Sequence, residues 1–96
     1  MLSGGQILGS QIVQGSEKAV HGINPATGEM LEPAYASGSH EDIEQACALA
    51  KSAFPIYRAT DSETRAVFLE TIAEQILALG DILIQRAMDE SGLPRA

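Results

Sequence analysis

The sequence has few aromatic residues, a single cysteine and no cluster of basic residues, and each shortage excludes a class of protein. Aromatic residues make up 4% of the 96 residues, so a hydrophobic core would consist of aliphatic side chains and alanine. One cysteine cannot form an internal disulfide, which agrees with a cytoplasmic location. The 6 Lys and Arg residues stand against 13 Asp and Glu, and the formal net charge is -7. Because phosphate contacts need clustered cations, we expect no binding to nucleic acid.

Long apolar runs are also absent. The apolar stretches are far shorter than the roughly 20 residues needed to cross a bilayer, and no basic patch followed by a hydrophobic segment stands near the start. We therefore expect no membrane association. A chain of 96 residues forms at most one domain, and its stability alone would be marginal.

The most clearly patterned stretch is residues 60–79, which predicts an amphipathic helix onto which the rest of the chain packs. Thr60 and Glu63 can form a reciprocal capping pair at its start, and Gly80 can supply a left-handed stop. Its apolar arc consists of Ala66, Phe68, Leu69, Ile72, Ala73, Ile76, Leu77 and Leu79. Because the alanine-rich neighbours offer little cover, we expect this arc to meet a surface outside these residues.

Strand patterns fill the first part of the chain. Residues 6–14 predict a strand, a turn and a strand, and residues 19–23 and 30–35 predict the arms of a second antiparallel hairpin. The turn between these arms is Asn24-Pro25-Ala26-Thr27-Gly28-Glu29, in which proline fixes φ and glycine permits a positive φ. Pro33 confines its strand to an edge or a bulge.

Helices are predicted on both sides of the central one. Ser39 is a suitable N-cap for the first helix, Asp42 can reach back to it, and Pro55 is expected to end the helix before a linker of residues 56–59. Asp81 can cap a third helix over residues 82–91, which Gly92 ends. The apolar stripe of the first helix is Ile43, Ala46, Cys47, Ala50 and Ala53 or Phe54.

These elements make an α+β segment: residues 1–38 hold an N-terminal β-hairpin and further strands, and residues 39–96 hold three helices. We treat the two stretches together as one partial domain. Four stretches of the sequence follow one another in a recognisable order. They are Asn24-Pro25-Ala26-Thr27-Gly28-Glu29, Asp42-Ile43-Glu44-Gln45-Ala46, Ala50-Lys51-Ser52-Ala53-Phe54 and Thr60-Asp61-Ser62-Glu63-Thr64-Arg65. In this order and spacing the chain resembles the N-terminal portion of the NAD(P)-dependent aldehyde dehydrogenase superfamily.

Three shorter stretches resemble one subgroup of that superfamily, the dehydrogenases of 2,5-dioxopentanoate, also called α-ketoglutarate semialdehyde. The stretches are Glu32-Pro33, Tyr57-Arg58-Ala59 and Ser91-Gly92-Leu93-Pro94-Arg95-Ala96. Ser91 departs from the threonine that is more usual before the glycine, which puts little in doubt.

The resemblance implies the α/β fold of an aldehyde dehydrogenase, a homo-oligomer, and oxidation of a small aldehyde with NAD or NADP through a cysteine thioester. It covers only the beginning of a family member, so the resemblance places the catalytic and cofactor-binding residues outside this chain, and the 96 residues alone are expected to be inactive. The remainder of the dehydrogenase, or another chain, would cover the face of Phe68, Ile72 and Ile76. The alternative is a stand-alone acidic interaction module without enzymatic activity, which would bury that face within its own residues.

No residue of this chain is assigned to a catalytic, cofactor-binding or metal site. Cys47 lies on the apolar stripe of the first helix, where burial would leave its thiol inert, so a structural cysteine is favoured. His21 and His40 lack partners at the spacing of a zinc site. We expect His40 to be a solvated residue at a helix start and His21 to be a surface or hydrogen-bonded residue in a strand.

Three weaker patterns could indicate sites. The spacing of Gly4 and Gly9 suits a phosphate-binding loop, but Ser10 stands where such a loop needs lysine. The resemblance also implies that main-chain oxygens of Gly22 and Ile23 could help bind a monovalent cation, although we favour a purely structural role in the hairpin. A solvated helix face, rather than an acid-base or metal group, is favoured for Glu63, Glu70 and Glu74.

Overall fold

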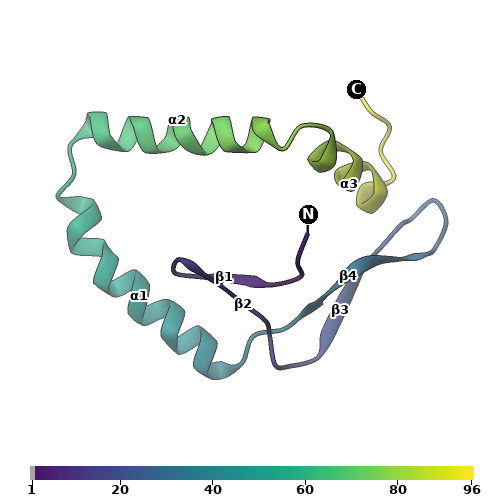
Figure 1. The fold of residues 1–96 in the computed structure, drawn as a ribbon, viewed down its shortest axis with the longest axis horizontal. Coiled ribbons are helices and arrows are strands. Elements are labelled where there is room, and N and C mark those ends of the chain that lie inside the picture. The colour runs from purple at the N-terminus through teal and green to yellow at the C-terminus, as the bar shows by residue number, and fades with distance from the viewer. Residues whose placement is uncertain (1) are drawn as a thin grey trace.

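The computed structural model describes residues 2–96, whose first part forms two antiparallel hairpins (Figure 1). Strand β1 (Gln6–Leu8) pairs with β2 (Gln11–Val13), and β3 (Ala19–Ile23) pairs with β4 (Met30–Ala36). Each pair forms its own two-stranded sheet. Both hairpins expected from the sequence are therefore confirmed.

The turn between β3 and β4 is closed by the residues that predicted it. The Asn24 side-chain oxygen accepts a hydrogen bond from the Ala26 N–H at 2.9 Å, and the Gly28 N–H donates to the Asn24 carbonyl at 2.7 Å. Gly28 has a φ of 77°, which confirms the expected positive φ. Asparagine and glycine thus fix this turn locally, before any packing acts on it.

Strand β4 is irregular where proline interrupts it. The register shifts between the pair Val20 and Tyr35 and the pair Gly22 and Leu31, and Pro33 lies within the shifted part of the strand. A proline cannot donate to a strand ladder, so this position suits it. The expected bulge is confirmed.

Helix α1 (His40–Arg58) begins as predicted and ends later than predicted. The Ser39 hydroxyl accepts from the Asp42 N–H at 3.2 Å, and the Asp42 carboxylate accepts from the Ser39 N–H at 2.8 Å. This reciprocal pair is the expected cap. The expected end at Pro55 is wrong, because the helix continues through this proline.

Local contacts lie around the end of α1, beyond Pro55. The guanidinium carbon of Arg58 lies 5.6 Å from the centroid of the Phe54 ring. Beyond it, the N–H and the hydroxyl of Thr60 both donate to the Tyr57 carbonyl, at 3.1 and 2.6 Å. The stretch expected to be a linker is therefore mostly helical.

Helix α2 (Ser62–Ala78) is capped by Asp61, not by Thr60 as expected. The Asp61 carboxylate accepts from the Thr64 N–H at 2.7 Å. Hydrogen bonding by Thr64 lowers the pKa of Asp61 below its ordinary value. Because the hydroxyl of Thr60 is engaged with the end of α1, the expected pair between Thr60 and Glu63 does not form.

Helix α3 (Asp81–Ser91) follows α2 almost directly. Gly80 has φ 54° and ψ -132°, so its positive φ is as expected but its conformation is not that of a left-handed helix. Asp81 lies in the first turn and does not cap the helix, contrary to expectation, and its carboxylate instead pairs with Arg95 at 2.7 Å. Gly92, with φ 70° and ψ 8°, ends α3 in the left-handed conformation as predicted.

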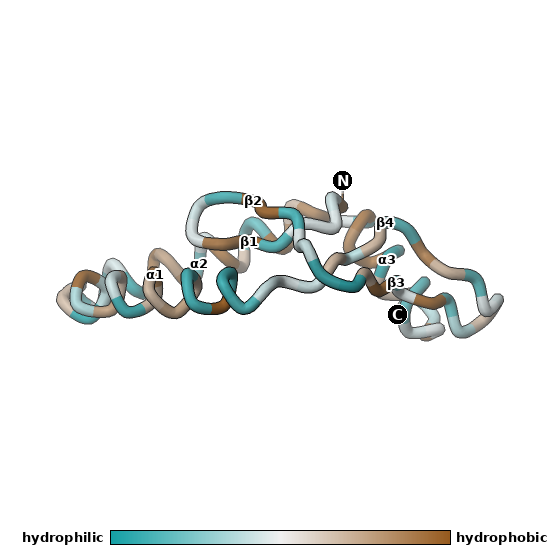
Figure 2. Tube along the Cα trace, turned by 90° about the horizontal axis from the view of Figure 1, so that it is seen from below, coloured by the Kyte–Doolittle hydropathy of each residue, from teal (hydrophilic) through white to brown (hydrophobic). Residues whose placement is uncertain are grey.

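The elements form a thin, open plate without a core (Figures 1 and 2). The Cα radius of gyration is 17.0 Å, whereas a compact chain of this length has about 12–13 Å. The accessible surface of 7753 Å² exceeds the roughly 5,300 Å² of a folded monomer of this mass. The Cα atoms extend 49 and 35 Å along the two longer axes and 17 Å along the shortest. Within residues 2–96 no hydrophobic side chain is buried.

The expectation that the chain packs onto the central helix is wrong. Among residues 2–96, elements approach closely only within the two hairpins, between α1 and β1, and between α3 and β3. Helix α2 touches α1 at their corner, where the rings of Tyr57 and Phe68 meet edge to face at 6.0 Å. Phe68, Ile72 and Ile76 are 51%, 41% and 51% exposed. The expected lack of cover for this face is confirmed.

Candidate functional site

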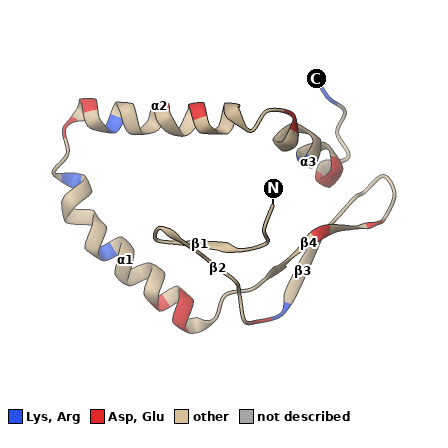
Figure 3. Ribbon diagram, viewed as in Figure 1, with Lys and Arg blue, Asp and Glu red and all other residues tan. Residues whose placement is uncertain are grey.

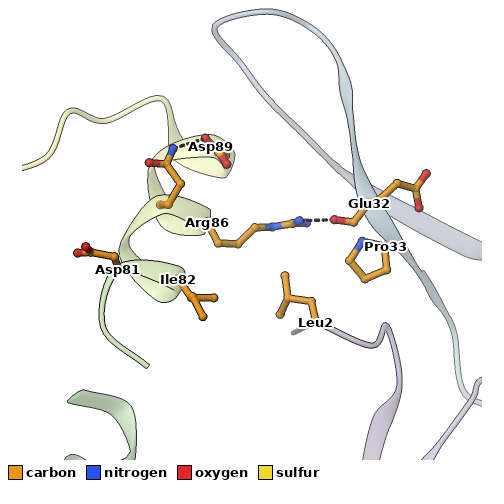
Figure 4. A pocket seen from close by; sticks show the side chains of 8 residues that line it. Leu2, Glu32, Pro33, Asp81, Ile82, Arg86 and Asp89 are labelled. Atoms are coloured by element: carbon orange, nitrogen blue, oxygen red, sulfur yellow. Dashed lines mark hydrogen bonds between the residues drawn. The ribbon is translucent and has the colours of Figure 1, made fainter. Parts of the chain in front are cut away.

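A cluster of polar contacts around Arg86 lies where α3 meets the hairpin of β3 and β4. Arg86 extends from α3 toward β4 (Figure 4), and its side chain is 17% exposed. Its Nε atom lies 2.6 Å from the Glu90 carboxylate, and its Nη1 donates to the main-chain oxygen of Glu32. One guanidinium therefore joins two turns of α3 to the irregular part of β4.

On the β3 side, the ion pair lies against Gly22. A Cβ atom added to Gly22 would lie 3.3 Å from Arg86 Nη2 and 3.3 Å from Glu90 Oε1. Hydrogen bonding by Glu90 raises the pKa of Arg86 above its ordinary value, so the guanidinium is charged at every accessible pH. Nη2 is buried and has no hydrogen-bond partner among residues 2–96. Glycine at this position leaves room for the ion pair against the strand.

An open cleft of about 1000 Å³ adjoins this corner (Figure 4). Leu2, Pro33 and Ile82 supply its apolar lining. Two of its carboxylates are engaged, because Asp81 pairs with Arg95 at 2.7 Å and Asp89 accepts from the Gln85 side chain at 2.8 Å, whereas the side chain of Glu32 is 81% exposed.

The histidines lie where the sequence indicated. His21 lies in β3, with Nδ1 3.2 Å from the Leu31 carbonyl and 3.8 Å from the Glu32 carboxylate. His40 is the first residue of α1, is exposed, and lies 3.5 Å from the Glu44 carboxylate. Both expected placements are confirmed.

Cys47 is exposed on α1, so the expectation that it is buried is wrong. Its helix face faces solvent because α1 approaches only β1 closely. Among residues 2–96 no hydrogen bond joins the thiol to another group, and an activated cysteine needs a base or a cation beside it.

Acidic residues are spread along the helices and the second hairpin, with few basic residues between them (Figure 3). Glu63, Glu70 and Glu74 are exposed, as expected. In the part of the chain that the structure describes, no group of three or more His, Cys, Asp or Glu side chains is placed to hold a metal ion. None of the described helices is long and apolar enough to cross a membrane.

Sequence reasoning did not single out Arg86. The available signal was its spacing from Glu90, because residues four apart on a helix can form an ion pair. The link to Glu32 joins positions 54 residues apart and depends on how α3 docks against the hairpin. A pattern within one helix could not indicate it.

The Asn24–Glu29 turn and the capped start of α1 lie at two of the stretches that carry the resemblance. The family model described as the aldehyde dehydrogenase family matches residues 12–96. The chain belongs to the aldehyde dehydrogenase family. The resemblance drawn from the sequence is therefore confirmed.

Two curated relatives of this aldehyde dehydrogenase segment carry a more specific name. The chain is 44% identical over 96 residues to alpha-ketoglutaric semialdehyde dehydrogenase 2 of Azospirillum brasilense, a match that covers 99% of this chain and 18% of the relative. It is 32% identical over 92 residues to alpha-ketoglutaric semialdehyde dehydrogenase of Acinetobacter baylyi, covering 96% of this chain and 18% of the relative. The chain thus spans 18% of the length of these relatives. No solved structure matches it.

Aldehyde dehydrogenases generally use NAD(P), and the described residues do not fit that cofactor. A dinucleotide pyrophosphate is commonly held at the N-terminus of a helix, where free N–H groups favour negative charge. Here Asp42, Asp61 and Asp81 lie at the starts of α1, α2 and α3. Each carboxylate would repel a phosphate, and two of them already accept the N–H bonds that a phosphate would need. We therefore assign no step of cofactor binding to this segment.

Proposed function

We propose that these residues belong to an enzyme that oxidises 2,5-dioxopentanoate to 2-oxoglutarate with NAD or NADP. The observation that carries the proposal is the 44% identity to a relative named alpha-ketoglutaric semialdehyde dehydrogenase 2, which extends over 99% of this chain. The second relative bears the same name apart from its number. The Glu32-Pro33 pair and the stretch of residues 91–96 support the same subgroup.

In this proposal the segment supplies scaffold and no reacting group. Chemistry through a cysteine thioester would use residues in the part of the relatives that this chain does not span. Cys47 is not the nucleophile in this proposal, because among residues 2–96 no hydrogen bond joins its exposed thiol to a base. Residues 1–38 and 39–96 would form one partial domain, and the protein would act as a cytoplasmic homo-oligomer.

The uncovered face of α2 supports this reading over a stand-alone interaction module. A self-sufficient module would bury Phe68, Ile72 and Ile76, yet within residues 2–96 no hydrophobic side chain is buried. Contiguous apolar surface of this kind marks an interface. We propose that the remainder of the dehydrogenase, or another chain, covers it.

The direct test uses the natural protein that carries residues 1–96. Its intact mass is measured, and the formation of reduced nicotinamide is followed with 2,5-dioxopentanoate and either NAD or NADP. We expect a mass well above 10.1 kDa and oxidation of the aldehyde. The matched control is the isolated 10.1 kDa chain, which should reduce no cofactor. Hydride transfer by that isolated chain, or no reaction of the natural protein with this aldehyde, would overturn the proposal.

A further inference from the structure

Among residues 2–96, Gly4 alone is buried, and it lies against β4. A Cβ atom added to Gly4 would stand 2.2 Å from the carbonyl oxygen of Ala34, so any side chain here would have to displace the strand. Two residues later, the Gln6 side chain donates to the Ala36 carbonyl at 3.0 Å. The chain before β1 therefore runs along β4, and we call residues 2–5 the strap.

The strap meets β4 in the part of the strand that β3 does not pair. There a single residue of β3, His21, faces three residues of β4, which are Glu32, Pro33 and Ala34. A bulge of this kind interrupts the ladder and leaves the extra residues without strand partners. Contacts from outside the ladder therefore help to decide how these three residues lie.

Two segments supply such contacts, and they lie at opposite ends of the described chain. From α3, Arg86 donates to the Glu32 carbonyl at one side of the bulge. From the strap, Gly4 lies against the Ala34 carbonyl at the other side. The bulge is thus held between the strap and α3, although within residues 2–96 no hydrogen bond joins these two segments directly.

An apolar side chain of the strap reaches the same corner. Figure 4 shows Leu2 between Ile82 of α3 and Pro33 of the bulge, and all three side chains line the open cleft. Leu2 is 45% exposed, so it reaches the corner without filling the cleft. The strap therefore approaches α3 through the middle residue of the bulge as well.

We propose that the strap locks α3 onto the hairpin by fixing the bulge of β4. Each of the two contacts needs the bulge in one conformation, so the segment that docks first meets the ordering cost and the second does not. The docking of the strap and the docking of α3 are therefore mutually favourable. Displacing the strap loosens α3, which lies far away in the sequence.

The test is amide hydrogen exchange of the natural protein, followed by mass spectrometry in peptides from α3. Gly4 has a φ of 69°, and Gly4→Ala should displace the strap and accelerate exchange in α3 at least about fivefold. The matched control is Gly9→Ala at the other end of β1, where φ is 64° and a Cβ meets only the Leu49 side chain, at 3.1 Å. It should change exchange in α3 less than about twofold. Acceleration by Gly4→Ala no larger than that by Gly9→Ala would overturn the proposal.

A second measurement covers the case in which Gly4→Ala does not fold. Because coupling between two contacts is reciprocal, releasing α3 should also loosen the strap. Arg86→Met removes the donor to Glu32 and keeps much of the apolar stem, so exchange in residues 2–8 should become faster. The control is Arg95→Met, which breaks the exposed pair with Asp81 and should leave residues 2–8 unchanged. If Arg86→Met affects residues 2–8 no more than Arg95→Met does, the strap and α3 are not coupled. Neither measurement depends on aldehyde oxidation, so both remain decisive if the proposed substrate is wrong.

Discussion

Gly92, at the end of α3, lies directly against Pro25 in the turn between β3 and β4. A Cβ added to Gly92 would stand 2.9 Å from the Cγ atom of Pro25. The helix therefore docks on the hairpin at two levels, through Arg86 at its middle and through a glycine at its end. The second level requires a residue without a side chain.

Gly92→Ala is expected to destabilise the natural protein more than Gly28→Ala does. Both glycines have positive φ, 70° and 77°, where an alanine costs about 1–2 kcal/mol. Only the first also meets a neighbour, because nothing lies within 4 Å of a Cβ at Gly28. Urea unfolding of the two variants provides the comparison. Equal losses would show that α3 is not seated on Pro25.

Ser39→Ala should lower the free energy of unfolding by about 1 kcal/mol, because it removes the side-chain acceptor at the start of α1. Ser39→Thr should retain most of that stability. The control is Ser52→Ala in the exposed middle of α1, where no cap is lost and a change within about 0.5 kcal/mol is expected. Urea unfolding of the natural protein measures all three variants. A loss for Ser39→Ala no larger than that for Ser52→Ala would argue against the capping pair.

If another surface covers the apolar face of α2, substitutions on that face should lower stability more than substitutions on the opposite face. Ile76→Ala should cost about 2–4 kcal/mol in the natural protein, as expected for a buried isoleucine. Glu74→Ala, on the opposite face, should change stability by less than about 0.5 kcal/mol. Thermal and urea unfolding would compare the stability of the two variants. If Ile76→Ala is as mild as the glutamate substitution, nothing covers this face.

Asp61 should make the start of α2 sensitive to acid. Hydrogen bonding by Thr64 lowers its pKa in the folded state, so folding favours the ionised carboxylate. This contribution is fully present above the unfolded-state pKa and is lost as the pH falls through the lowered folded-state pKa. Asp61→Asn keeps an acceptor that cannot ionise. Urea unfolding from neutral to acidic pH should show a shallower loss of stability for Asp61→Asn, and an unchanged slope would count against the assignment.

Local signals predicted most of the elements, and the misses come from competition between neighbouring residues. Ser39 and Asp42 act within one turn, so their pattern was sufficient. Thr60 and Asp61 are both good caps, and the choice between them depended on the Tyr57 carbonyl, which takes the Thr60 hydroxyl. Pro55 weakens a helix without forbidding it, and the contacts around it decide.

The candidate site was less predictable than the fold. Arg86 and Glu90 share a helix, but their role depends on Gly22 and Glu32, which belong to strands far away in the sequence. The helix at α2 and the exposure of Phe68, Ile72 and Ile76 were expected correctly, whereas the position of α2 as the centre of packing was not. An amphipathic pattern shows that a face needs cover and does not show which residues provide it.

The plate, 17 Å thick along its shortest axis, has a consequence for the newly synthesised protein. Because the plate has no core, its exposed leucine and isoleucine side chains can associate with other apolar surfaces until another part of the protein covers them. We expect such a chain to bind chaperones that hold unfinished polypeptides and to aggregate when they are scarce.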